Sequence, residues 1–319
     1  MDAFYRLVTS LAVSLMSALG IQAPPATWQL QMMPDGRTVS LTFSDHSHSS
    51  HGATMAIDQF DGLKPLLQTT GAARFRLKRD AGVFEFDGVL RGGAGGGTME
   101  FVPSETFPQE LARRGFAKPT RVEQMKMAWH DAGLAFIEEL AAENYQRPTL
   151  TQLVNAGDHG VNRIYLHEMS RLGYRVGTVD ALIRMRDHGV SADYIQDVSA
   201  LGLAHLSVDD LVRARDHGID PGYIRELASL GHKPLTLDEL VAARDHGVGP
   251  DYVRQLGALG YPSISLANLI RLRDHGVSPE WLRTVQAQNS GKLSIDELVS
   301  LRDHGVNSIE ALRRRTHAS

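Results

Sequence analysis

The chain has 319 residues, of which 42% are hydrophobic and 22% charged, a composition typical of a folded globular protein with room for two or three domains. Its formal net charge of −4 argues against a nucleic-acid-binding protein, because such proteins normally carry a basic surface. Cysteine is absent, which excludes disulfides, thiolate metal sites and a cysteine nucleophile.

Residues 1–23 have the features of a signal peptide. Arg6 precedes an apolar run over residues 7–19. The small residues Ala18 and Gly20 suit the −3 and −1 positions of a cleavage site. We therefore expect the mature protein to be periplasmic or secreted. The alternatives are an uncleaved membrane anchor, for which the run is short, and an amphipathic helix packed on the fold.

Residues 24–103 predict a small antiparallel β domain of about five strands. Apolar residues alternate in two runs within 28–43, separated by a Pro-Asp-Gly turn, which indicates a β-hairpin. A polar loop and a short helix near 63–67 follow, and three more alternating runs lie within 75–103. We expect the glycine-rich stretch 91–98 to be a flexible hairpin loop, because it lacks the Gly-Lys-Ser/Thr of a phosphate-binding loop and precedes a strand.

The polar loop of this domain contains a candidate metal site. His46, His48 and His51 include the His-x-His spacing that occurs in some metal sites. The alternative is a solvated loop, because the surrounding serines offer nothing to fix the geometry of the ligands. Elsewhere no constellation of nucleophile and base can be singled out from spacing, so we expect no catalytic residues and no cofactor.

Residues 104–131 connect the β domain to a series of repeats. They predict two helices, at 107–115 and 121–132, separated by Lys118 and Pro119. We expect this segment to link the two regions and to form the N-terminal cap of the repeats.

The tripeptide Asp-His-Gly occurs six times at a constant period of 29 residues, which is typical of stacked-repeat proteins. Cutting the chain after each copy gives six full units, which start at residues 132, 161, 190, 219, 248 and 277, and a partial unit from 306. In each unit, numbered from 1 to 29, helix N-cap residues occupy positions 2 and 18, and only Gly or Asn occupies position 13. Each unit therefore predicts two helices of about ten residues. Because such short helices are unstable alone, we expect residues 132–319 to form an α-solenoid.

Two further features of the repeats support stacking. Position 5 is aromatic in every full unit, and we expect these rings to pack between repeats rather than to stack on a ligand. The partial unit departs from the pattern, since Glu310 replaces the aromatic residue and three arginines follow at 313–315. A polar terminal half-repeat is suited to cap a solenoid.

Each full unit has Asp at position 27 and His at position 28. These residues are Asp158, His159, Asp187, His188, Asp216, His217, Asp245, His246, Asp274, His275, Asp303 and His304. Asp near a helix C-terminus costs about 0.3–1 kcal/mol, so we expect compensating contacts. The carboxylate would accept hydrogen bonds from the following unit or pair with the Arg that occupies position 26 in five units.

The alternative roles for the Asp-His pairs are chemical. A metal ladder would need side chains of neighbouring units to share an ion, and a spacing of about 10 Å between packed helices disfavours that. A pH response is the third possibility, because imidazoles titrate near pH 6.5.

The stretch Phe-Arg-Leu-Lys-Arg-Asp-Ala-Gly-Val-Phe-Glu-Phe-Asp-Gly at residues 75–88, followed by the Asp-His-Gly-Val repeats, resembles the extracytoplasmic tails of certain uncharacterised bacterial proteins. Some of those tails are attached to BlaR1-like (M56 family) membrane metallopeptidases. The resemblance covers about residues 73–305. This chain lacks the membrane spans and the His-Glu-x-x-His helix of the peptidase, so the resemblance implies an envelope-facing sensing or interaction module and no proteolysis.

The sequence thus predicts an α+β protein with an antiparallel β domain followed by an α-solenoid. We expect a non-catalytic, exported interaction or sensing scaffold whose solenoid face presents positions 8, 10, 11 and 24 to a protein or peptide. The alternative is a metal-binding or metal-sensing envelope protein that uses the His46 loop or the Asp-His pairs. We expect no nucleic-acid partner, and membrane association only through residues 1–23 if they are retained.

Overall fold

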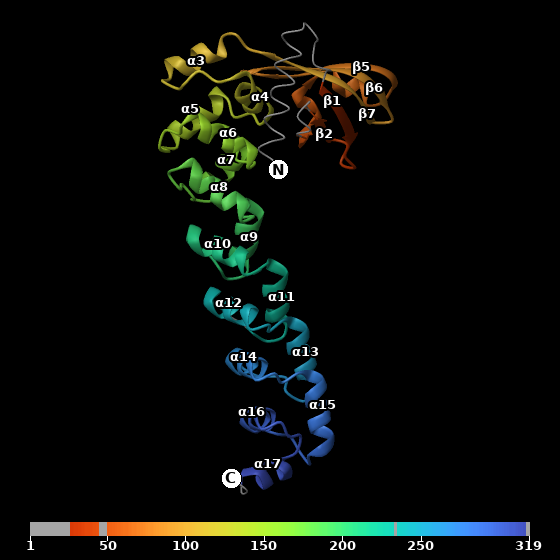
Figure 1. The fold of residues 1–319 in the computed structure, drawn as a ribbon, viewed down its shortest axis with the longest axis vertical. Helices are drawn as coiled ribbons and strands as arrows, with labels where there is room; N and C mark the ends of the chain where they lie inside the picture. The colour runs from red at the N-terminus through yellow and green to blue at the C-terminus, as the bar shows by residue number, and fades with distance from the viewer. Residues whose placement is uncertain (1–25, 45–49, 233–234, 317–319) are drawn as a thin grey trace, which may run out of the picture. The chain divides into compact units, whose positions relative to one another are not determined.

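The computed structural model describes residues 26–44, 50–232 and 235–316 (Figure 1). It is an α+β fold in which an antiparallel β-sheet precedes a long series of helices. The described chain forms two compact units. The first contains the sheet and the helices up to residue 166, together with residues 177–179, and the second contains the helices beyond them. This division falls within the repeats rather than at the change of pattern near residue 104.

The described strands form a seven-stranded antiparallel sheet with the order β3-β2-β1-β7-β6-β5-β4. The strands are β1 (Ala26–Met32), β2 (Thr38–Ser44), β3 (Ser50–Ala56), β4 (Phe60–Asp61), β5 (Thr70–Arg79), β6 (Gly82–Arg91) and β7 (Ala94–Pro103). A short 3-10 helix η1 (Ile57–Gln59) precedes β4, and the one-turn helix α2 (Leu63–Leu66) follows it. Alternate side chains bury one face of the sheet, where Trp28 packs edge-to-face on Phe75 and Phe86.

The prediction of about five strands was too low because two strands lack a strong hydrophobic alternation. β3 lies partly in the segment expected to be a polar loop, and its sequence is mostly small and polar. It pairs with β2 at an edge of the sheet, so its backbone rather than its side chains determines its place. β4 has only two residues and is fixed by the buried ring of Phe60.

The prediction of a flexible glycine loop at residues 91–98 was wrong. The turn is confined to Gly92 and Gly93, both with positive φ, and Ala94 begins β7, which pairs with both β6 and β1. A Cβ at Gly95 would lie 2.0 Å from the carbonyl oxygen of Val89, and a Cβ at Gly97 would meet backbone equally closely. The glycines therefore permit close approach of neighbouring strands in the sheet.

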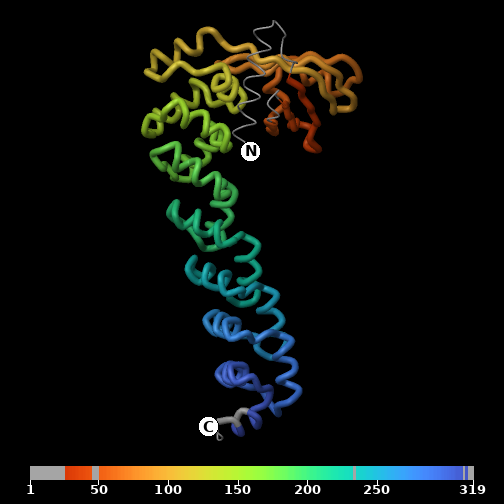
Figure 2. The backbone as a smooth tube through the Cα atoms, viewed as in Figure 1, coloured from red at the N-terminus to blue at the C-terminus, as the bar shows by residue number. Residues whose placement is uncertain are grey.

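The helices after the sheet follow the repeat, two to each 29-residue unit (Figure 2). They are α3 (Phe107–Arg113), α4 (Arg121–Trp129), α5 (Leu134–Ala142), α6 (Leu150–Asp158), α7 (Arg163–Arg171), α8 (Val179–Asp187), α9 (Ala192–Ala200), α10 (Val208–Asp216), α11 (Pro221–Ser229), α12 (Leu237–Asp245), α13 (Pro250–Ala258), α14 (Leu266–Asp274), α15 (Pro279–Gln288), α16 (Ile295–Asp303) and α17 (Ile309–Thr316). In the second compact unit, odd-numbered helices pack on odd-numbered ones and even on even, from α9 to α16.

The capping pattern is confirmed at both ends of the helices. At position 2, the side chain of Asp220 accepts a hydrogen bond of 2.9 Å from the backbone N–H of Tyr223. At position 18, Thr236 and Glu239 form a reciprocal capping box. Position 13 is left-handed where it is glycine, as at Gly231 with φ of 93°. Asn289 is the exception, because its backbone is extended and α15 continues to residue 288.

The repeat begins one unit earlier than the Asp-His-Gly motif indicates. Counting back 29 residues from residue 132 places α3 and α4 in a unit that starts at residue 103. Phe107 occupies position 5, and Ser104 at position 2 accepts from its N–H at 3.2 Å. Gly115, at position 13, has φ of 74°, and Thr120 at position 18 forms a capping box. The segment predicted to be a helical linker and N-terminal cap of the repeats therefore has the pattern of a degenerate repeat.

The tip of the β5–β6 hairpin is bonded to this degenerate repeat and to the next one. Asp80 accepts a hydrogen bond of 2.5 Å from the N–H of Leu134, so its carboxylate caps α5. Gly133, at the N-cap position of α5, has no side chain, and a Cβ there would lie 2.1 Å from the Asp80 carboxylate. Buried Gln124, at position 22 where the full units have Leu, donates to the carbonyl of Ala81 at 2.7 Å.

Within the described segments, the helices are too short or too polar for any of them to cross a lipid bilayer. Residues 1–23, for which export was predicted, lie outside the described residues.

Candidate functional site: the inter-repeat ladders and loop grooves

The Asp-His pairs form a ladder of hydrogen bonds between consecutive units. In four consecutive steps, His Nδ1 at position 28 of one unit lies 2.5 to 2.7 Å from Asp Oδ1 at position 27 of the next. The pairs are His188–Asp216, His217–Asp245, His246–Asp274 and His275–Asp303. An ionised carboxylate can only accept, so Nδ1 carries the proton and donates it. This bond compensates for placing Asp at a helix C-terminus.

The predicted partners of the Asp carboxylate were therefore wrong for these four steps. The donor is the imidazole of the preceding unit, and neither the following unit nor the Arg at position 26 supplies it. The His of one unit and the Asp of the next thus form one hydrogen bond between units, although His and Asp are adjacent in the sequence within each unit.

The two ends of the ladder differ from its middle. His304 has no full unit after it, and its Nδ1 lies 2.8 Å from the carbonyl oxygen of Ser300 in its own helix. At the other end, the degenerate repeat supplies His130, whose Nε2 lies 3.2 Å from Asp158, while Lys126 contacts the same carboxylate at 2.6 Å. Burial lowers the pKa of His130, with His51 and Lys126 acting in the same direction and Asp158 opposing them.

The Arg at position 26 stacks on the aromatic residue at position 5 of its own unit. The guanidinium carbon of Arg244 lies 4.7 Å from the ring centroid of Tyr223, and the same stack recurs at Arg215–Tyr194, Arg273–Tyr252 and Arg302–Trp281. The Tyr223 hydroxyl donates to the carbonyl of Val248, at position 1 of the next unit, at 2.9 Å. The prediction that the rings pack between repeats is confirmed.

Burial of these hydroxyls raises the pKa of Tyr194, Tyr223 and Tyr252 to about 12. Each hydroxyl satisfies a backbone carbonyl at the start of the following unit. The aromatic column is therefore part of the frame that holds successive units together, and it is not open to a ligand.

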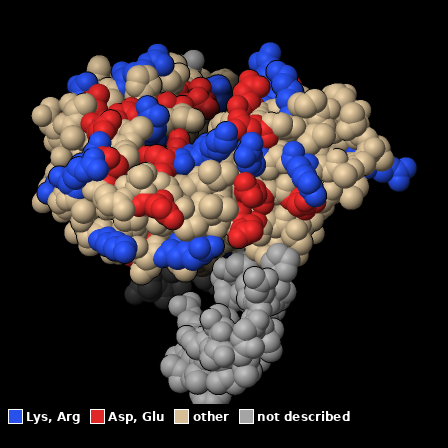
Figure 3. Space-filling model, turned by 90° about the horizontal axis from the view of Figure 1, so that it is seen from above, with Lys and Arg blue, Asp and Glu red and all other residues tan. Residues whose placement is uncertain are grey.

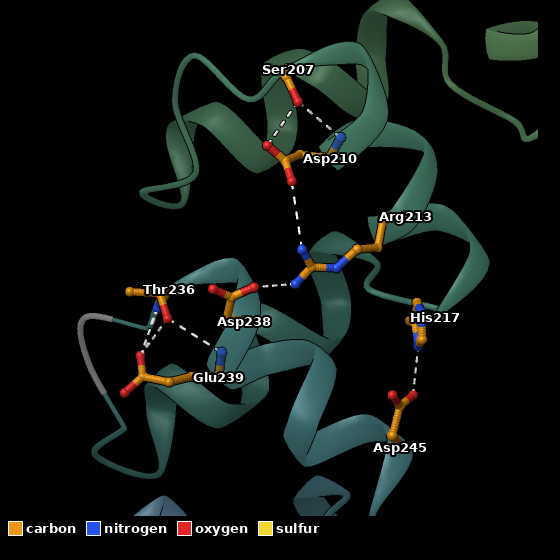
Figure 4. Close-up of polar contacts among 8 residues, drawn as sticks. All are labelled: Ser207, Asp210, Arg213, His217, Thr236, Asp238, Glu239 and Asp245. Atoms are coloured by element: carbon orange, nitrogen blue, oxygen red, sulfur yellow. Dashed lines mark hydrogen bonds and ion pairs between the residues drawn. The ribbon is translucent and has the colours of Figure 1, made fainter.

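A second ladder of ion pairs connects the even-numbered helices (Figure 4). Arg213, at position 24 of its unit, pairs with Asp238 at position 20 of the next and also contacts Asp210 on its own helix. Arg184–Asp209 and Arg271–Asp296 repeat the arrangement at 2.6 Å. Position 24, which was expected to face a partner, is thus used for contacts within the stack in these three units.

The second ladder has a gap between α12 and α14. Position 24 there is Ala242, and position 20 of the next unit is Ala267. Both partners of the ion pair are lost together, so no unpaired charge remains. Position 24 alone does not reveal that its residue varies together with position 20 of the next unit. The relationship becomes visible when the two positions are compared across units.

The candidate metal ligands are only partly described. His46 and His48 lie outside the described residues. His51 lies in β3, where its ring stacks on Phe43 with centroids 4.9 Å apart. Among the described residues, no group of three or more His, Asp or Glu side chains is arranged to hold a metal ion.

Grooves occur where the loops between the two helices of neighbouring units meet. One, of about 330 Å³, is lined by residues of α5 and by the loops that follow α3 and α5. Another, of about 630 Å³, lies between the loops that precede α14 and α16. In both, a cation at position 16 lies over the ring at position 14 of the preceding unit, as Arg147 does over Phe116 and Lys292 over Tyr261.

Charged side chains are mixed on the surface. Acidic and basic residues are interspersed over the face drawn in Figure 3, and no large area of one sign stands out on it. No protein-family model matches the chain, and no curated protein matches it.

Proposed function

We propose that this chain is a non-catalytic, exported scaffold that binds a protein or peptide through the repeat surface. The proposal is supported by the different roles of two sets of residues in each unit: those that recur in every unit and those that vary. Residues common to the units are occupied by contacts between units, as at His217–Asp245 and Tyr223–Val248. Exposed residues on the odd-numbered helices differ from unit to unit.

Position 8 illustrates this variable surface. It is occupied by Asp197, Glu226, Gln255 and Thr284 on α9, α11, α13 and α15, and all four side chains are exposed. A periodic frame with a changing exposed row is how helical-repeat proteins present extended binding surfaces. The resemblance of residues 73–305 to extracytoplasmic tails supports an envelope-facing location.

The test is capture of a partner on the immobilised full chain from an envelope extract of the cells that produce it. The double variant Asp197→Arg/Gln255→Arg places two cations on the odd-numbered helices. We expect it to recover about tenfold less of any specific partner, since unfavourable charge at an interface costs several kcal/mol. Ala267→Arg adds a cation at an exposed site on an even-numbered helix and should leave recovery unchanged.

Two results would count against the scaffold. Equal recovery by the wild type and the double variant would show that the partner does not bind at the odd-numbered helices. Stoichiometric zinc, copper or nickel in the purified chain would favour the metal-binding alternative. Mass spectrometry of the mature N-terminus tests export, for which we expect cleavage after Gly20.

A further inference from the structure

An apolar pocket lies at the first junction between repeats, inside the first compact unit. It has a volume of about 330 Å³, and its lining includes Phe116, Ile137, Leu140, Ala141, Tyr145 and Arg147. Phe116, Leu140 and Tyr145 are themselves buried, so the walls are fixed by the core of the repeats. The volume is at the lower end of the range of small-molecule sites.

The pocket coincides with a departure from the residue that is common at position 12 of later units. Position 12 is a half-buried Leu in four later units, namely Leu172, Leu201, Leu230 and Leu259. In the degenerate repeat it is Arg114, whose guanidinium pairs instead with Glu110 and Glu138.

Position 10 of the next unit is a small residue at the first junction and at most later ones, and it is Gln only at the last full junction. At the last full junction it is Gln286, whose amide donates to the carbonyl of Leu259 at 2.6 Å. At the first junction it is Ala141, which is too short to make that contact.

One cation at the pocket has no carboxylate partner among the described residues. Arg147 stacks over Phe116 at 4.7 Å and donates to the carbonyl of Arg114, whereas both acids nearby are paired with Arg114. Gly115 permits this position, because a Cβ there would lie 2.7 Å from Arg147 Nη2. The guanidinium has five N–H donors in a planar fork that suits a carboxylate.

We propose that this pocket binds the C-terminal residue of a peptide or protein partner when that residue has a large apolar side chain. The side chain enters the pocket above Phe116 and Ala141, and the terminal carboxylate accepts hydrogen bonds from Arg147. A chain end carries both groups on one carbon, which matches a guanidinium placed directly over the pocket's aromatic wall. The inference rests on the proposed scaffold function and assigns it a specific recognition element.

The experiment measures binding of three probes to the purified full chain by ligand-detected NMR. The probes are the peptide acetyl-Gly-Gly-Phe with a free carboxylate, the same peptide as its C-terminal amide, and 3-phenylpropionate. We expect saturable binding of the peptide acid at about 1 mM, a weak affinity that is normal for so small a ligand. The amide should bind about fivefold more weakly, because the charge-assisted hydrogen bond is lost.

Variants separate the two parts of the site. Arg147→Gln should remove the preference for acid over amide, while Lys292→Gln, at the same position of a later unit, should preserve it. Ala141→Gln introduces the residue found at position 10 of the last full unit and should abolish binding of both peptides. Ala228→Gln, at position 10 of a unit with Leu at position 12, is its control. Unchanged thermal unfolding of each variant shows that the fold is retained.

The proposal is overturned if neither peptide binds up to about 10 mM, if Ala141→Gln binds as the wild type does, or if acid and amide bind equally. Binding of 3-phenylpropionate as tight as the peptide acid would also overturn it, because the pocket would then accept a free acid without a chain. If the peptide acid binds the pocket but no partner is captured through the odd-numbered helices, the proposed scaffold function is wrong and the pocket proposal still stands.

Discussion

His217 Nδ1 lies 2.6 Å from Asp245 Oδ1, 28 residues later in the chain, and this offset is the same at each described step of the ladder. Both side chains are more than one third exposed, so the bond is worth about 0.5 kcal/mol. In a double-mutant cycle with His217→Ala and Asp245→Ala, we expect a coupling of that size in urea unfolding. His304, whose Nδ1 lies against a carbonyl of its own helix, is the control. Coupling below the error of the cycle would show that the ladder contributes nothing to stability.

Tyr223→Phe should destabilise the protein by about 1–2 kcal/mol, because the carbonyl of Val248 loses its buried donor. The raised pKa of Tyr223, about 12, adds a pH dependence. The unfolded chain releases this proton near pH 10, so the stabilisation is complete below pH 10 and is lost between pH 10 and 12. Tyrosinate absorbance should show this group titrating late in the native protein. Titration of all tyrosines near pH 10 without unfolding would contradict the buried hydrogen bond.

The gap in the second ladder can be filled by design. Ala242→Arg with Ala267→Asp recreates at α12 and α14 the pairing seen at Arg213–Asp238. We expect the double variant to be about 0.5 kcal/mol more stable than the sum of the single variants, and the gain to decrease at high salt. Additive single effects at low salt would show that the helices are placed differently here.

The hairpin tip offers a test by rescue. Asp80→Ala removes the only side chain that caps α5 among the described residues and should cost about 1 kcal/mol. Gly133→Ser should be unfavourable in the wild type, because its Cβ meets the Asp80 carboxylate. In the Asp80→Ala background the same substitution should instead restore stability, since serine then caps the helix from the usual position. Absence of rescue would mean that Asp80 acts in some other way.

The low pKa of His130 predicts a loss of stability in acid. Because burial lowers its pKa below 6.5, the unfolded chain binds more protons as the pH falls through that value. Stability should therefore decrease below pH 6.5 until His130 is protonated in the folded protein as well. His130→Gln should flatten this part of the profile, measured by urea unfolding between pH 5 and 7.5, whereas exposed His167→Gln should not. An unchanged slope in His130→Gln would assign the effect to other groups.

Much of the helical region could be predicted because its local chemistry repeats. Asp220 and Thr236 cap the helices that their spacing predicted, and Gly231 adopts the left-handed backbone expected of it. The partners across units could not be predicted in the same way. Nothing in the adjacency of Asp245 and His246 indicates that each bonds a different neighbouring unit.

The sheet was harder to predict because backbone pairing, rather than side-chain pattern, fixes parts of it. β3 has little hydrophobic alternation, and the glycines of β7 are typical of a loop although they lie between two strands. The pocket at Ala141 and Arg147 was also missed. A signal was present in the departure of Arg114 from the leucine column, but it is visible only once the degenerate repeat is recognised.

The constant offset of the contacts between units has a consequence for how the protein can change in length. The His–Asp and Tyr–carbonyl bonds from one unit are received at the same positions of the next, so removing residues 219–247 would bring His217 within reach of Asp274 and Tyr194 within reach of the carbonyl of Val248. Whole units can therefore be excised or copied in tandem with these two kinds of contact re-forming, although after this excision Arg213 would face Ala267 in place of Asp238. The first junction differs most from the others, so the units on either side of it are the least suited to such exchange.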